Sequence, residues 1–233
     1  MTNPCRRHFQ RVTAALAAAA VAGPDQTMEG LNAYEQQLAK LTQDRLRLSG
    51  IQSTEGKIKL KEQLLPEYAP YIEGVLSAGL GAQDEVVTTV MVWRIDTGDY
   101  AGALDIASYV LQHKLVMPDR FERTTGCLIA EEIAEGALKA MRADQAFDLE
   151  LLHRTALATD AEDMPDQARA KLVLATARAT VAGLTVENPG KPDQVQAGID
   201  LFRRAIELHD NCGGKTDLKT AEALLKKIAG QAS

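Results

Sequence analysis

Apolar residues recur at the spacing of an α-helix through most of this chain. One stripe carries Val86, Val90 and Trp93 at positions i, i+4 and i+7, and the leucines from Leu31 to Leu48 recur in steps of seven and three. No segment alternates apolar and polar residues as a half-buried strand does. Aromatic residues make up only 4% of the 233 residues, whereas strands favour aromatic and β-branched side chains. The sequence therefore predicts an all-α fold.

Glycine and proline residues mark where the predicted helices begin and end. Pro66 and Pro70 predict a break between two helices, because proline cannot donate the backbone hydrogen bond of a helix interior. We expect helices at 31–48, 54–65, 71–80, 83–96, 100–113, 125–141, 145–159, 165–184, 194–209 and 218–228. We predict three regions, namely an N-terminal basic arm and linker (1–30), a helical core domain (31–190) and a C-terminal helical hairpin (191–233).

Two pairs of predicted helices have the small-residue spacing of a tetratricopeptide-like hairpin. The first pair turns at Gly98, with Ala103 on its second helix, and we expect Trp93 and Tyr100 to form an aromatic pair across the turn. The second pair spans 205–225. A regular period of about 34 residues is absent. The predicted architecture is therefore a set of antiparallel helical hairpins with tetratricopeptide-like character, and not a regular repeat array.

Charge is unevenly distributed along the chain. The formal net charge of −6 excludes a protein that coats nucleic acid with its whole surface. Residues Lys40–Lys61, however, contain six basic and two acidic side chains, a local balance of +4. Residues Asp144–Asp166 contain seven acids and one arginine, a balance of −6. The basic segment is either a local nucleic-acid surface or a solvated charged helix.

The N-terminal segment and the cysteines bear on the compartment of the protein. Arg6 and Arg7 precede an apolar run at 12–22, which is typical either of a secretory signal or of an N-terminal helix. No other apolar run approaches the roughly 20 residues that a membrane span needs. The three cysteines have neither disulfide nor metal-ligand spacing, and they favour a reducing compartment.

Residues Gly213–Thr216 spell the GKT end of a phosphate-binding loop. The full motif requires another glycine where His209 stands, and it requires a preceding β-strand, whereas the preceding residues have a helical pattern. A glycine turn between two helices explains the residues better. We therefore expect no nucleotide and no other cofactor.

Four carboxylates are weak candidates for a metal-dependent nuclease site. Such a site needs convergent carboxylates on a rigid frame, and Asp84, Glu85, Asp96 and Asp99 lie close in sequence. Aspartate is also the residue of helix N-caps and turns, which explains Asp96 and Asp99 more simply. The four histidines share no ligand spacing and face no evident nucleophile. We therefore expect no metal site, and no catalytic constellation is visible.

Several blocks of residues, in order along most of the chain, resemble one protein family. They include Arg7-His8, Tyr34-Glu35-Gln36, Leu64-Leu65-Pro66, Gly74-Val75-Leu76, Gly81-Ala82-Gln83-Asp84, Trp93-Arg94, Asp96-Thr97-Gly98-Asp99, Met117-Pro118 and Asp163-Met164-Pro165-Asp166. This pattern resembles the small terminase subunit of contractile-tailed bacteriophages, a family also named terminase endonuclease subunit. The resemblance implies a protein of the host cytoplasm that acts in genome packaging, forms homo-oligomeric rings, and has double-stranded DNA and a terminase large subunit as partners. It also favours the N-terminal helix over the secretory signal.

Three functions remain open from the sequence. The first is a DNA-recognition subunit that presents the packaging site on concatemeric DNA to the large ATPase and nuclease subunit. Its expected DNA-binding residues are basic: Arg6, Arg7, Arg11, Lys40, Arg45, Arg47, Lys57, Lys59 and Lys61. The second is a metal-dependent endonuclease in its own right, and the third is a helical scaffold with protein partners only. The family name includes endonuclease, but we expect the chemistry to reside in the large subunit.

Overall fold

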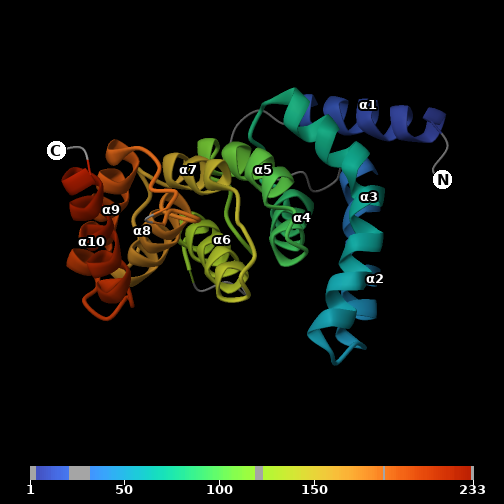
Figure 1. Cartoon of the computed structure of the whole chain (residues 1–233). Coiled ribbons are helices and arrows are strands. Elements are labelled where there is room, and N and C mark those ends of the chain that lie inside the picture. The colour runs from blue at the N-terminus through green and yellow to red at the C-terminus, as the bar shows by residue number, and fades with distance from the viewer. Residues whose placement is uncertain (1–3, 21–31, 119–122, 186, 232–233) are drawn as a thin grey trace. The chain divides into compact units, whose positions relative to one another are not determined.

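The structure, a computed structural model, describes residues 4–20, 32–118, 123–185 and 187–231. These residues form ten α-helices and no β-strand, which confirms the all-α prediction (Figure 1). The chain divides into two compact units, residues 1–125 and 126–233. This boundary differs from those of the predicted arm, core and hairpin, which stay a prediction. Within the predicted arm and linker (1–30), residues 1–3 and 21–30 lie outside the described residues.

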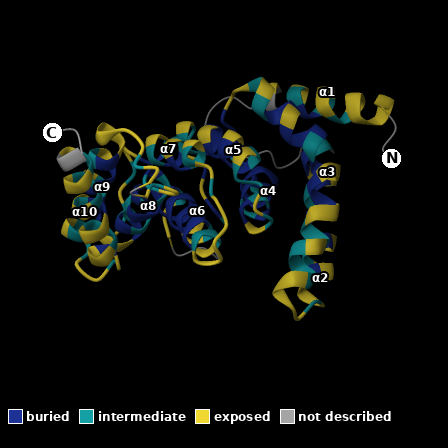
Figure 2. Cartoon of the chain, in the orientation of Figure 1, coloured by how far each residue is buried: buried dark blue, intermediate teal, exposed yellow. Residues whose placement is uncertain are grey.

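Unit 1 contains the first five helices. These are α1 (Pro4–Ala20), α2 (Asn32–Ser49), α3 (Thr54–Ala78), α4 (Glu85–Asp96) and α5 (Tyr100–Gln112). Helix α3 packs against α1, α2 and α4, and α4 also packs against α5. Figure 2 shows how buried positions dominate α4, whereas much of α1 is exposed. The long helix α3 is therefore the element on which unit 1 is assembled.

Helix α3 runs unbroken through Pro66 and Pro70, so the predicted break is wrong. An interior proline costs about 3 kcal/mol, because it removes a backbone donor and crowds the preceding turn. On the same helix, large side chains such as Leu64, Tyr68 and Ile72 are buried, and each contributes roughly 1.5–3 kcal/mol. Tertiary packing therefore outweighs the local cost. Figure 1 shows α3 changing direction along its length, as a proline-containing helix does.

Helices α1 and α3 approach each other closely at Gly74. A Cβ atom at this position would lie 2.4 Å from the carbonyl oxygen of Arg11 and 2.7 Å from the Cβ atom of Ala14. These separations are shorter than a van der Waals contact, and the first involves backbone that cannot move aside cheaply. Glycine is therefore the residue that lets the backbone of α1 rest on α3, with Ala14 fully buried between them.

The corner between α4 and α5 forms as the sequence predicts. Asp99 is the N-cap of α5, and its side chain accepts a hydrogen bond from the backbone N–H of Gly102 at 3.1 Å. Gly98 has a φ of 77°, which glycine adopts without strain. The ring found against Trp93 is that of Tyr68 on α3, edge-on with 5.8 Å between centroids. The predicted pair of Trp93 with Tyr100 stays a prediction.

Unit 2 contains the other five helices, the first of which begins at the last residue of unit 1. They are α6 (Thr125–Arg142), α7 (Leu149–Ala158), α8 (Asp166–Thr180), α9 (Pro192–Leu208) and α10 (Lys215–Gln231). Helix α8 packs against α7 and α9, α9 packs against α10, and Phe202 of α9 is fully buried. Two ion pairs, both with N–O separations of 2.5 Å, join Lys171 of α8 to Glu131 and Glu135 of α6.

The glycines of the GKT segment form the expected turn between two helices. They follow helix α9 and not a strand, and Lys215 is the first residue of α10. The Nζ atom of Lys215 lies 2.7 Å from an Oδ atom of Asp210. The segment therefore does not have the strand–loop–helix arrangement that a phosphate-binding loop requires.

Candidate nucleic-acid interface

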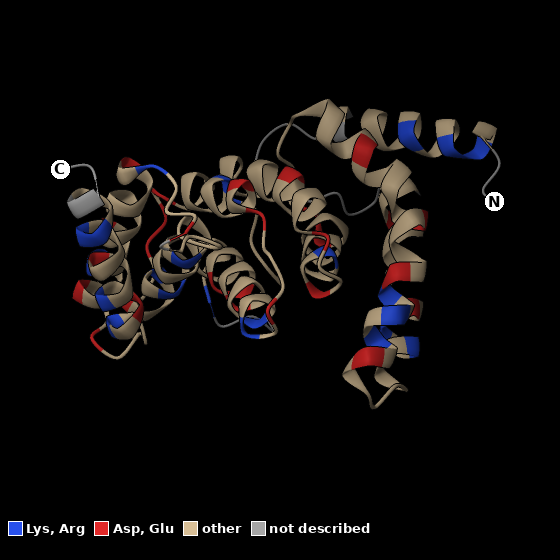
Figure 3. Ribbon diagram, viewed as in Figure 1, with Lys and Arg blue, Asp and Glu red and all other residues tan. Residues whose placement is uncertain are grey.

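Helix α1 presents positive charge alone. Arg6, Arg7 and Arg11 are all exposed on it, and the helix contains no acidic residue (Figure 3). None of these arginines forms an ion pair with any residue that the structure describes. Figure 3 also shows that α2 and the first half of α3 differ, since basic and acidic residues mix there. The two predicted basic surfaces are therefore electrostatically unlike.

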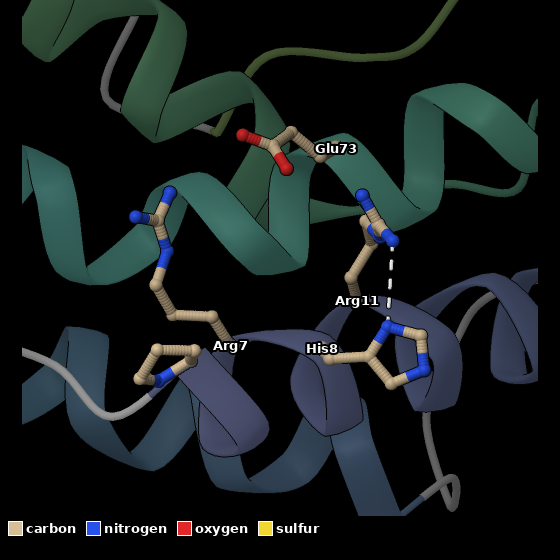
Figure 4. A pocket seen from close by; sticks show the side chains of 5 residues that line it. Arg7, His8, Arg11 and Glu73 are labelled. Carbon is tan, nitrogen blue, oxygen red and sulfur yellow. Dashed lines mark hydrogen bonds between the residues drawn. The ribbon is translucent and has the colours of Figure 1, made fainter.

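A pocket of about 300 Å³ lies where α1 rests on α3. Pro4, Arg7, His8 and Arg11 line it from α1, and Glu73 lines it from α3 (Figure 4). Arg7 and Arg11 are four residues apart, so their side chains leave the same face of the helix. Arg11 donates a hydrogen bond from Nη2 to Nδ1 of His8 at 3.4 Å. Two guanidinium groups thus face one cavity, and within the described part of the chain neither is neutralised by an ion pair.

This arrangement can hold an oxyanion. A guanidinium group offers several N–H donors in a planar fork that matches the oxygens of a phosphate. The carboxylate of Glu73 opposes an anion electrostatically, and it confines the favourable region to the α1 side of the pocket. The pocket is therefore suited to one phosphate group of a polyanion.

The second basic region is largely neutralised within the protein, beginning with Asp44. The Asp44 side chain is buried, and its carboxylate accepts hydrogen bonds from Lys40 Nζ at 2.7 Å, Arg47 Nη1 at 2.8 Å and the Tyr68 hydroxyl at 2.8 Å. Burial acts to raise the pKa of Asp44, but the hydrogen bonds from Lys40 and Tyr68 outweigh it and leave that pKa below its usual value. Lys40 also lies 4.1 Å from the centroid of the Tyr68 ring. Lys40 and Arg47 therefore neutralise the buried carboxylate of Asp44.

Two further cations tie helices together. Arg45 of α2 lies 2.6 Å, Nη1 to Oε1, from Glu85 of α4, and Lys61 of α3 lies 2.5 Å, Nζ to Oδ2, from Asp96 at the end of α4. The Lys61 side chain is only 15% exposed. Of the remaining predicted cations, Lys59 pairs with Glu55 on the exposed surface of α3. Lys57 forms no ion pair within the described part of the chain.

The predicted DNA-binding residues thus divide into two groups. Lys40, Arg45, Arg47 and Lys61 hold α2, α3 and α4 together or neutralise a buried carboxylate. The second group lies on α1 and at the start of α3: Arg6, Arg7, Arg11 and Lys57 form no ion pair with a described residue, and Lys59 pairs only with the exposed Glu55. The sequence did not indicate Glu73 as part of the site, because only the packing of α1 on α3 brings it beside the arginines. In the sequence, the signal for this site is the i, i+4 spacing of Arg7 and Arg11, which places both arginines on one face of a helix.

The carboxylates considered for a metal-dependent nuclease have separate structural partners. Asp84 is the buried N-cap of α4 and accepts from the backbone N–H groups of Val86 and Val87 and from the Tyr71 hydroxyl. Burial raises its pKa to about 6. Asp99 caps α5 and pairs with Arg94. Among the described residues, no cluster of three histidine, cysteine, aspartate or glutamate side chains could hold a metal ion.

Comparison with known proteins gives two matches. The profile of the family described as phage small terminase subunit matches residues 38–167. The terminase, endonuclease subunit, of Escherichia phage P2 is 40% identical over 226 residues, which cover 97% of this chain and 87% of the phage P2 protein. No solved structure matches the chain. None of the helices that the structure describes combines the length and the apolar character needed to cross a bilayer.

Proposed function

Because the chain belongs to the phage small terminase subunit family, we propose that it recognises the packaging site on concatemeric phage DNA in the host cytoplasm. It then presents that DNA to a large subunit, which supplies the ATPase and the nuclease. Several copies act together in a homo-oligomer. The observation that carries the proposal is the pocket between α1 and α3, where Arg7 and Arg11 face one cavity and form no ion pair with a described residue.

Phosphate binding at α1 accounts for DNA binding by an acidic protein. Each phosphate that an arginine neutralises releases condensed counterions, so the affinity falls steeply as salt rises. One copy offers few such contacts, because its net charge is −6 and most cations of the Lys40–Lys61 segment are already paired. In an oligomer the α1 surface is repeated, and binding through several copies multiplies a modest affinity.

The decisive experiment measures DNA affinity across a salt series. We expect the variant Arg7→Ala/Arg11→Ala to lower the affinity and to reduce the magnitude of the slope of log K against log salt by about 1 for each copy in contact, since the pocket holds one phosphate and each phosphate contact contributes about 0.9. Lys226→Ala/Lys227→Ala is the charge-matched control. These two lysines are exposed on α10 and form no ion pair with a described residue, and we expect their removal to leave the slope unchanged.

A third variant separates the two basic surfaces. Lys57→Ala/Lys59→Ala tests the start of α3 and leaves Lys61 in place, because loss of Lys61 would also break its pair with Asp96. Equal losses of DNA affinity in all three variants would contradict a site at α1 and would indicate a nonspecific electrostatic attraction between the protein and DNA. No binding by the wild-type chain at low salt would contradict DNA recognition and favour a scaffold with protein partners only.

A second candidate function follows from the name of the phage P2 relative, which includes endonuclease. If this chain cleaved DNA itself, the purified protein would cut packaging-site DNA in the presence of Mg²⁺ and without a large subunit, and Asp96→Asn would abolish the cut. Asp96 pairs with Lys61 in the structure. We therefore expect no cleavage by the isolated chain.

A further inference from the structure

Helix α1 has an exposed apolar stripe on the side away from α3. Three of the seven large apolar side chains that the described residues expose lie on it: Phe9 (67% exposed), Val12 (40%) and Leu16 (65%). Their spacing of i, i+3 and i+7 places them on one face, and Ala14 on the opposite face is fully buried. A contiguous apolar stripe of this kind marks a contact surface rather than scattered surface residues.

The charge of α1 decides what kind of surface can cover this stripe. Arg6 lies three residues before Phe9 and therefore borders the stripe, and the helix carries no acid. Two α1 helices that met along their stripes would bring like charges together. The complementary partner is a surface with an exposed apolar residue in a region of net negative charge.

The chain itself carries such a surface on α7. Leu157 is 81% exposed there, the most exposed of the large apolar side chains described. Glu150 lies seven residues before it on the same face of the helix, with Arg154 between them on that face, and Asp160 follows in the turn after α7. Neither acid forms an ion pair with a residue that the structure describes. These residues belong to the segment Asp144–Asp166, whose balance is −6.

We propose that α1 of one copy docks on α7 of a second copy, with Phe9 and Leu16 against Leu157 and with Arg6 beside the acids that flank α7. The inference rests on the proposed function only in taking a second copy as the partner. The contact joins two different surfaces, so it is head-to-tail, and repetition of such a contact closes a ring when the rotation allows. Arg7 and Arg11 leave α1 towards the pocket and not from the stripe, so they stay available to DNA.

The test uses two variants of the full chain. Each variant removes one of the two surfaces, and each substitutes glutamine so that no new charge is introduced. Phe9→Gln/Leu16→Gln removes the α1 surface, and Glu150→Gln/Leu157→Gln removes the α7 surface. Leu46→Gln is the control, because Leu46 on α2 is 68% exposed and lies on neither surface. Sedimentation velocity without DNA, over a concentration series, gives the oligomeric state, and circular dichroism verifies that each variant is folded.

We expect each double variant alone to be monomeric or to associate at least tenfold more weakly than the wild type, and the control to associate normally. An equimolar mixture of the two variants has one intact α1 surface and one intact α7 surface. We expect it to form a dimer and to stop there. A mixture that remains monomeric overturns the proposal. Mixing restores association only if the α1 surface of one copy binds the α7 surface of another, and not if like surfaces pair or if the contact lies within one chain.

The outcomes also separate this surface from the proposed function. A wild-type chain that is monomeric at every concentration contradicts both the self-association and this contact. A wild-type oligomer that neither variant weakens contradicts the contact alone. DNA binding across the salt series is scored independently of both results.

Discussion

Two buried aspartates in unit 1 have opposite electrostatic environments. Asp44 and Asp84 are 3% and 0% exposed, and each accepts a hydrogen bond from a tyrosine hydroxyl. Asp44 also has two cationic partners, so its pKa stays below the usual value despite burial, and its stabilising contribution is lost as the pH falls. Asp84 has no cationic partner among its hydrogen bonds, and burial raises its pKa to about 6. The neighbouring groups, and not the residue type, therefore decide whether the pKa of a buried aspartate is raised or lowered.

We predict that Asp84→Asn removes a pH dependence of stability between about pH 4 and pH 6. Because the folded pKa of Asp84 is raised from 3.8 to about 6, its contribution is greatest below pH 4 and is lost as the pH rises through 6. A rise of this size corresponds to about 3 kcal/mol. Urea unfolding at pH 4, 5, 6 and 7 measures the difference between wild type and variant. Asp148→Asn, at an exposed N-cap, is the control and should show no such trend.

We predict that Glu73→Gln strengthens DNA binding. The Glu73 carboxylate lines the same pocket as Arg7 and Arg11, so its removal takes away a like charge from a bound phosphate. A single charge near the surface is worth about 0.5–1 kcal/mol, which corresponds to an affinity gain of about two- to fivefold at low salt. Fluorescence anisotropy with labelled DNA measures the gain. Glu62→Gln, an exposed acid elsewhere on α3, is the matched control, and an equal gain there would rule out a role for the pocket.

Helix α3 shows how packing overrides local preference. Its two interior prolines predict two helices, yet the buried residues on both sides of them belong to one. The same helix offers Gly74, whose missing side chain admits the backbone of α1. A glycine in a helix usually weakens it, by roughly 1 kcal/mol relative to alanine. Here the glycine permits a helix–helix contact and so sets where Arg7 and Arg11 stand.

We predict that Gly74→Val displaces α1 from α3. The new side chain would begin 2.4 Å from the Arg11 carbonyl oxygen, and overpacking of this kind costs about 1–3 kcal/mol. Hydrogen exchange should show loss of protection in α1 while α4 and α5 stay protected, and DNA affinity should fall with it. Gly50→Ala is the control, because a Cβ atom there meets nothing closer than 3.5 Å. Unchanged exchange in α1 would show that its position does not depend on this contact.

Each of the two units has a hydrophobic core of its own. Tyr68, Tyr71 and Met91 are among the largest fully buried side chains of unit 1, and Phe202 and Leu152 are among those of unit 2. The single tryptophan, Trp93, is buried in unit 1. Its fluorescence therefore reports on the packing of unit 1, whereas helical circular dichroism reports on both units.

We predict that Phe202→Ala destabilises unit 2 and leaves unit 1 intact. Truncation of a fully buried phenylalanine costs about 3–5 kcal/mol. Denaturant unfolding followed by circular dichroism should show an early transition that Trp93 fluorescence does not. Met91→Ala in unit 1 is the reciprocal control and should shift the fluorescence transition. Coincident shifts of both signals with Phe202→Ala would mean that the two units unfold as one.

The helical class, most helix positions, the Asp99 cap and the turn at Gly213 follow from the sequence, because helical period, capping and glycine turns depend on residues only a few positions apart. The unbroken α3, the pairing of Lys61 with Asp96, and the pocket that unites Arg7 with Glu73 do not follow from it. These features join residues that are distant in the chain, or they balance a local cost against burial elsewhere. Only the packing of the helices decides which cations are neutralised inside the protein and which remain for a partner.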